Sequence, residues 1–171
     1  RYRAIDGQPA YVAFYECDSV DVLTSRDYRD KVANPTPSTR RILPRFRNVL
    51  RSACRQTLSI GRGIGGTAIL VQCKPMAGRY DAARRFLETE LGPRLQREGA
   101  LLRLTLLETD TAVTGMPSSE RELRNDQDNY PHWVLFIETY DLDKAALSLH
   151  AGILECEAAK TGLLFGSWAR Y

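Results

Sequence analysis

Residues 67–108 read TAILVQCKPMAGRYDAARRFLETELGPRLQREGALLRLTLLE. The first seven residues, Thr67–Cys73, are mostly β-branched or aliphatic, which is typical of a strand. Apolar residues then recur with the spacing of one helix face and predict a helix over 79–97, in which Gly92-Pro93 can break the last turn. Ala100–Glu108 is again apolar and predicts a second, longer strand. The stretch therefore predicts strand, helix and strand in that order.

The chain beyond this stretch repeats the alternation. A polar segment over 109–129 predicts a loop that is mobile or acts as a lid. His132–Tyr140 predicts a strand, a helix capped by Asp141 or Asp143 follows, and Leu163–Ala169 predicts the last strand. The resulting order, strand-helix-strand, loop, strand-helix-strand, is the split βαβ or ferredoxin-like arrangement.

The first 62 residues predict a similar but shorter unit. Ala10–Glu16 predicts a strand, and Gln56–Ile60 predicts another. Between them, a helix over 40–55 is predicted because apolar residues recur at helical spacing and arginines occupy the opposite face. Its predicted buried residues are Ile42, Phe46, Val49, Leu50 and Ala53. Arg1–Ile5 has the pattern of the end of a strand already under way, so the order is strand, strand, helix, strand. This order matches a ferredoxin-like unit that lacks its first strand and most of its first helix, and we therefore expect the chain to begin inside a domain.

These patterns predict an α+β fold made of tandem ferredoxin-like repeats over residues 1–62 and 66–171. The two antiparallel sheets would face each other with the helices outside, as one pseudo-dimeric α/β barrel. A glycine-rich stretch, Gly61–Gly66, is best interpreted as the hinge between the repeats. It runs directly into a strand, whereas a dinucleotide-binding loop opens a helix.

Composition places the chain among ordinary globular proteins. It has 171 residues, of which 43% are hydrophobic and 26% charged, and this excludes collagen-like and disordered chains. No apolar run approaches the roughly 18 residues of a membrane span. Four cysteines lack the paired spacing of a zinc site, so we expect reduced thiols, no metal and a cytoplasmic protein.

Charge is distributed unevenly along the sequence. Residues 31–80 contain ten Lys or Arg and no Asp or Glu, which leaves −7 for the remainder of the chain. A solvated or subunit-facing basic surface is the favoured interpretation, ahead of a mouth for an anionic substrate. Nucleic acid is least favoured because no groove-reading fold is evident. We therefore expect no nucleic-acid partner and no membrane, and a homodimer is possible.

Short segments of the chain, together with its element order, carry a resemblance to a known family. The segments are Arg1-Tyr2-Arg3-Ala4, Gly7, Pro9, Tyr11, Phe14-Tyr15-Glu16, Asp21-Val22-Leu23, Tyr28, Pro35-Thr36-Pro37 and Gly61-Arg62-Gly63. At the level of element order the whole chain resembles the dimeric α/β-barrel superfamily in a tandem form, and these segments are similar to an uncharacterised bacterial branch of it. The superfamily includes cofactor-free quinone-forming monooxygenases, lactone isomerases, polyketide cyclases and haem-binding enzymes.

The resemblance implies a small cofactor-independent enzyme of aromatic catabolism, acting on an aromatic or polyketide-like metabolite by proton transfer. Isomerase, cyclase, lyase and quinone-forming monooxygenase reactions all fit. His132 would be the acid or base, because imidazole titrates near neutral pH. The remaining predicted site residues are Tyr11 and Tyr15, which would orient an oxygen, Arg40 and Arg62, which would stabilise negative charge, and Trp168, which would bind substrate.

Each of these residues also has a structural interpretation, and other hypotheses stay open. Glu16 and Glu138 interrupt apolar strands and would be candidate bases if buried. Haem binding would need His132 or His150 as the axial ligand, and no cofactor is expected. The alternative function is a non-catalytic binding or assembly module whose basic helix meets an anionic partner.

Overall fold

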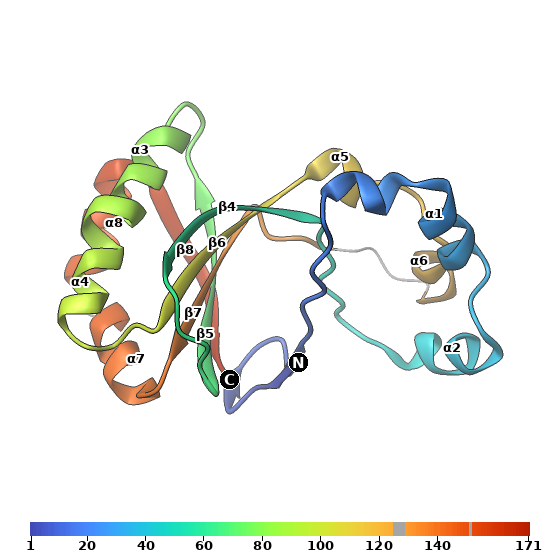
Figure 1. Cartoon of the computed structure of the whole chain (residues 1–171), viewed down its shortest axis with the longest axis horizontal. Coiled ribbons are helices and arrows are strands. Elements are labelled where there is room, and N and C mark those ends of the chain that lie inside the picture. The colour runs from blue at the N-terminus through green and yellow to red at the C-terminus, as the bar shows by residue number, and fades with distance from the viewer. Residues whose placement is uncertain (125–128, 151) are drawn as a thin grey trace. The chain divides into compact units, whose positions relative to one another are not determined.

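A computed structural model of the chain describes residues 1–124, 129–150 and 152–171 (Figure 1). The chain forms two compact units that interleave along the sequence. The first unit contains Arg1–Ala13, Gln56–Glu108 and Pro131–Tyr171, and the second contains Phe14–Arg55 and Thr109–Tyr130.

The first unit is built on a six-stranded sheet with the order β2-β8-β5-β7-β6-β4. Strand β5 (Thr67–Pro75) is central and pairs antiparallel with β7 (Trp133–Thr139) and with β8 (Leu163–Arg170). Strand β6 (Arg103–Thr109) pairs antiparallel with β7. The edge strands are β4 (Cys54–Gly61) and β2 (Asp6–Gly7). The predicted strands after residue 56 are therefore present, and β5, β6, β7 and β8 carry the core of the unit.

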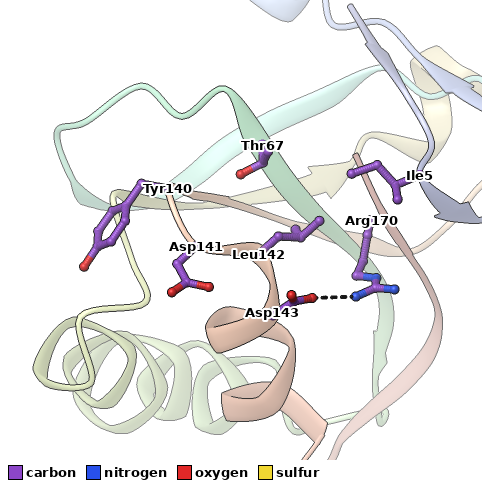
Figure 2. Close-up of a pocket in the computed structure, with 7 residues that line it drawn as sticks. All are labelled: Ile5, Thr67, Tyr140, Asp141, Leu142, Asp143 and Arg170. Carbon is purple, nitrogen blue, oxygen red and sulfur yellow. Dashed lines mark hydrogen bonds and ion pairs between the residues drawn. The ribbon is translucent and has the colours of Figure 1, made fainter.

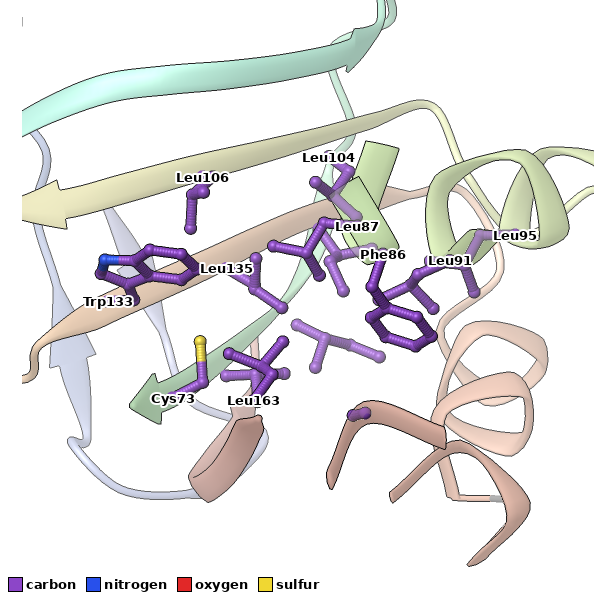
Figure 3. Close-up of a cluster of buried hydrophobic side chains, with 14 of the residues drawn as sticks. Cys73, Phe86, Leu87, Leu91, Leu95, Leu104, Leu106, Trp133, Leu135 and Leu163 are labelled. Carbon is purple, nitrogen blue, oxygen red and sulfur yellow. The ribbon is translucent and has the colours of Figure 1, made fainter. Parts of the chain in front are cut away.

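Helices cover one face of this sheet, as Figure 1 shows. Side chains alternate across a strand, so Ile69, Val71 and Cys73 face these helices while Leu70 faces the opposite side. Figure 3 shows how Phe86 and Leu91 from the helices pack against the sheet residues. The helices are α3 (Tyr80–Phe86), α4 (Gly92–Arg97), α7 (Leu142–His150) and α8 (Gly152–Thr161).

A π-helical turn, η3 (Leu87–Leu91), joins α3 to α4. The Gly92 N–H donates to the Leu87 carbonyl, five residues earlier, and both leucines at the ends of the turn are fully buried. Pro93 cannot donate a backbone hydrogen bond, and the wider turn accommodates it without ending the helical stretch. The predicted break at Gly92-Pro93 is therefore a change of helical pitch.

The other face of the sheet carries a smaller apolar cluster. Strand β1 (Tyr2–Arg3) pairs antiparallel with β3 (Tyr11–Val12) in a separate two-stranded sheet, and Tyr2 and Val12 pack against this cluster. The Tyr2 ring meets Phe136 edge-on, with ring centroids 5.3 Å apart. The buried members of the cluster are Leu70, Val134, Ala169 and Tyr171.

The second unit consists of short helices, several of which begin at a hydroxyl cap. Ser19, Ser25 and Thr36 each accept a backbone N–H from the first turn that follows. Val20 and Leu43 are its buried apolar side chains among the described residues. Local caps, rather than a large core, therefore define its helices. They are η1 (Val20–Thr24), α1 (Arg26–Ala33), α2 (Pro37–Ile42), η2 (Leu43–Arg45), α5 (Thr111–Thr114) and α6 (Ser119–Arg124).

The predicted helix over 40–55 is wrong. Helix α2 ends at Ile42, a single 3₁₀ turn follows, and Phe46 has extended backbone angles. Pro44 lacks an N–H, and a continued helix would place Arg41 above Arg45, a like-charged pair that opposes it. Of the predicted buried residues, Ile42, Phe46 and Leu50 are exposed, and Val49 and Ala53 are half-buried.

Two further predictions need correction. The strand predicted over Ala10–Glu16 is reduced to the two residues of β3, because the chain leaves the sheet at the unit boundary after Ala13. The segment predicted as a loop over 109–129 contains α5 and α6, and Asp110 caps α5 by accepting the Val113 N–H.

The α+β class is confirmed: an antiparallel sheet with helices on one face forms the larger unit. None of the helices in the described residues combines the length and the apolar character that crossing a membrane requires.

Candidate functional site

The three predicted catalytic residues lie on the surface. His132 is exposed in the bend that precedes β7. Tyr11 on β3 is 69% exposed, and Tyr15 in the second unit is 79% exposed. None of the three lines the two first-unit pockets described below. Their catalytic roles stay predictions.

The predicted substrate-binding residues lie in different surroundings. Arg40 is exposed in α2, and its Nε donates to the Pro35 carbonyl at 3.1 Å. Arg62 is exposed in the glycine-rich connection between β4 and β5. Trp168 is half-buried on β8 and packs against the main core. His150 ends α7, and its side chain lies outside the described residues.

Trp168 lines an apolar cleft between the sheet and its helices. The cleft has a volume of about 40 Å³, which is room for about one water molecule. Its single carboxylate is Glu155, an exposed residue of α8. The other lining residues are Val71, Leu135, Leu149, Phe165 and Gly166.

A larger, open pocket of about 540 Å³ lies where α7 begins (Figure 2). Arg170 donates to both Asp6 and Asp143. The two carboxylates raise the pKa of Arg170, and the hydrogen bond from Arg170 lowers the pKa of Asp6. Asp141 caps α7 by accepting the Lys144 N–H at 3.0 Å. The sequence offered Asp141 or Asp143 as this cap but did not indicate the pocket, since Arg170 is 27 residues away from Asp143 along the chain. The lining residues are Ile5, Thr67, Tyr140, Asp141, Leu142, Asp143 and Arg170.

Glu138, one of the two candidate bases, is buried on β7 with 1% of its surface exposed. Its Oε2 accepts Arg103 Nε at 2.6 Å, and its Oε1 accepts the Gly65 N–H at 3.3 Å. Burial and the Glu138 charge raise the pKa of the neighbouring Tyr2, and Arg103 partly offsets them. Glu16, the other candidate, is exposed. Glu138 therefore ties the glycine-rich connection to the sheet.

A charged cluster at the end of β6 was not predicted from the sequence. Glu108 accepts Arg84 through both carboxylate oxygens, at 2.6 and 2.7 Å, and also accepts the Thr57 hydroxyl at 2.6 Å. Burial raises the Glu108 pKa, but the hydrogen bonds from Arg84 and Thr57 outweigh it and the pKa is lowered. The Arg84 guanidinium also lies 5.6 Å from the centre of the Trp133 ring. Helix and strand periodicity does not indicate such a pair, because Arg84 and Glu108 are 24 residues apart.

The second unit exposes a stretch of basic and apolar side chains, residues 40–47, which reads RRILPRFR and is called the basic segment below. All four of its arginines are exposed. Within the described part of the chain none of the four pairs with a carboxylate. Ile42 and Phe46 are 49% and 47% exposed. The arginines are Arg40, Arg41, Arg45 and Arg47.

Local contacts hold the basic segment in place. Leu43 is buried and anchors it, with 7% of its surface exposed. The Arg47 guanidinium donates to the carbonyls of Pro44 and Phe46. The charged and aromatic side chains are therefore presented on a defined turn.

Over residues 1–124, 129–150 and 152–171, no group of three or more His, Cys, Asp and Glu side chains is placed to hold a metal ion. Comparison with known proteins matched the chain to no family model, no curated protein and no solved structure.

Proposed function

We propose that this protein is a binding or assembly module whose basic segment engages an anionic partner. The observation that carries the proposal is the group of four exposed arginines in eight residues without a carboxylate partner in the described residues. An isolated surface ion pair contributes only about 0–1 kcal/mol. A partner must therefore engage several of these arginines together.

Exposed apolar side chains favour a protein partner over a nucleic acid. Phe46 and Ile42 lie between the arginines, and arginine with aromatic residues is the composition enriched at protein interfaces. Aliphatic Ile42 offers no surface for base stacking, which single-stranded nucleic acids use. An acidic protein segment that also carries apolar residues fits this surface.

Fluorescence anisotropy with a labelled decaglutamate peptide tests the proposal. The double variant Arg41→Glu/Arg45→Glu should raise the dissociation constant about tenfold or more, because attraction becomes repulsion. The matched control, Arg85→Glu/Arg97→Glu, changes the net charge equally at exposed arginines of the first unit. Equal losses in both variants would reduce the binding to net charge alone and contradict the proposal. A double-stranded DNA probe that binds more tightly than the peptide would contradict the choice of a protein partner.

A cofactor-independent enzyme acting on an aromatic or polyketide-like metabolite is the second candidate. The apolar cleft beside Trp168 favours it, because the cleft lies between a sheet and its covering helices and carries a single carboxylate. The cleft would have to widen to hold such a substrate. In this candidate His132 is the acid or base and Arg62 the stabilising charge. Neither residue lines the cleft, so both would have to approach it when substrate binds.

Quenching of tryptophan fluorescence by a hydroxynaphthoquinone tests this second candidate. Saturable quenching that disappears in Trp168→Phe would support it, and non-saturable quenching equal in both proteins would contradict it. If turnover is found, His132→Ala should lower it about 10²–10⁴-fold while leaving the melting temperature unchanged.

We also propose that residues 66–171 form a ferredoxin-like unit. The order of β5, β6, β7 and β8 along the chain, and their order β8-β5-β7-β6 in the sheet, support this assignment. The division into tandem repeats at 1–62 and 66–171 stays a prediction.

A further inference from the structure

The open pocket of the first unit has chemistry opposite to that of the basic segment. Asp141 and Asp143 line it, and Asp6 adjoins it through Arg170, so three carboxylates accompany one guanidinium. Asp143 is 89% exposed at its side chain. The volume of the open pocket, about 540 Å³, lies within the roughly 300–1,000 Å³ typical of ligand pockets.

Two carboxylate oxygens in this pocket can still accept hydrogen bonds. Asp141 uses Oδ1 to cap α7, and Asp143 uses Oδ1 to accept from Arg170 at 3.1 Å. The Oδ2 atoms of both residues have no donor within the described part of the chain. Carboxylate oxygens are the acceptors that a guanidinium pairs with most strongly.

Apolar surface accompanies these carboxylates. Ile5 and Tyr140 line the same pocket and are 63% and 66% exposed. The Tyr140 hydroxyl is held by the Gly99 carbonyl, so the side chain has a fixed position. The pocket therefore offers carboxylates and apolar surface together, as the basic segment offers arginines and Phe46.

We infer that the partner of the basic segment is a second copy of this chain, whose open pocket receives it. This inference rests on the proposed function and names its partner. Arg41 or Arg45 of one copy pairs with Asp141 and Asp143 of the other, and Phe46 packs on the Ile5 and Tyr140 surface. When both copies contribute a segment and a pocket, the contacts are reciprocal and close a dimer.

Sedimentation velocity on the full chain tests the inference at low and high salt. The unmodified protein should dimerise in the micromolar range, and raised salt should weaken the dimer. Arg41→Glu/Arg45→Glu and Asp143→Arg should each raise the dimer dissociation constant about tenfold or more. Combining all three substitutions in one chain should restore dimerisation, because the charges are exchanged rather than lost.

Matched controls place the charge changes at other exposed residues of the first unit. Arg85→Glu/Arg97→Glu and Glu98→Arg should leave the dimer unchanged. A dimer that weakens with the arginine variant but not with Asp143→Arg, or that the triple variant fails to restore, would overturn the pocket as the receiving site. A protein that stays monomeric yet binds decaglutamate would overturn the second copy as partner and leave the proposed function standing.

Discussion

Glu138 is a buried carboxylate with 1% of its surface exposed. Its burial is compensated by hydrogen bonds from Arg103 and from the Gly65 N–H. Glu138→Gln removes the charge and weakens both hydrogen bonds, so it should lower the free energy of unfolding by about 1–3 kcal/mol. Urea denaturation measures this, with Glu98→Gln as an exposed control. Gly65→Ala should also destabilise, since a Cβ there would lie 2.7 Å from the Thr139 carbonyl oxygen. Unchanged unfolding in Glu138→Gln would contradict the structural role.

Glu108 gives the first unit a component of stability that depends on pH. Its folded-state pKa lies below the ordinary value of 4.5, so the Arg84 pair stabilises the fold above pH 4.5 and this contribution is lost as pH falls through the folded-state pKa. Glu108→Gln should therefore flatten the decrease in unfolding free energy on acidification, and Arg84→Ala should do the same. Acid unfolding curves of both variants that match the unmodified protein would count against the pair.

The four thiols should differ in reactivity, because the thiolate is the nucleophile. Burial raises the pKa of Cys73 to about 12 and also raises that of Cys54, whereas Cys17 and Cys156 are exposed. Alkylation followed by mass spectrometry should label Cys17 and Cys156 first, Cys54 more slowly, and Cys73 only when the chain unfolds. Early labelling of Cys73 would show that its strand is not packed as described.

At the scale of single elements, the stability of a Phe46 variant distinguishes the predicted helix from the observed turn. A buried Phe46 would make Phe46→Ala cost about 3–5 kcal/mol, but its 47% exposure predicts a loss below about 1 kcal/mol in the free energy of unfolding. Phe86→Ala, at a side chain 2% exposed, should show the full 3–5 kcal/mol. Thermal and urea unfolding compare the two variants. A loss of about 3–5 kcal/mol in the free energy of unfolding of Phe46→Ala would instead support the predicted helix, with Phe46 on its buried face.

The sequence patterns succeeded where periodicity and burial agree. Strands β5, β6, β7 and β8 and the helices between them were predictable because their apolar residues face one core. The same rule failed over 40–55, where the apolar spacing is helical but Pro44 and neighbouring arginines oppose a helix. Pairs such as Arg84–Glu108 depend on residues that meet only after folding, so no local pattern indicates them.

For the whole molecule, the uneven charge of the sequence has a structural counterpart. The stretch over 31–80, which has no Asp or Glu, includes both the basic segment and the interior strand β5. Its excess of positive charge therefore does not lie on one face of a single long helix. Residues 40–47 place four exposed arginines within eight residues, and none of the four has a carboxylate partner in the described part of the chain. The account therefore predicts that binding of an anionic partner depends on these residues and not on net charge.

The most direct test of this claim is one ratio: the dissociation constant of decaglutamate for Arg41→Glu/Arg45→Glu divided by that for Arg85→Glu/Arg97→Glu. Both variants carry the same net charge, so the ratio isolates the position of the arginines. The account predicts a ratio of about ten or more at low salt, decreasing as salt screens the pairs. A ratio near one, with both proteins folded, would contradict it.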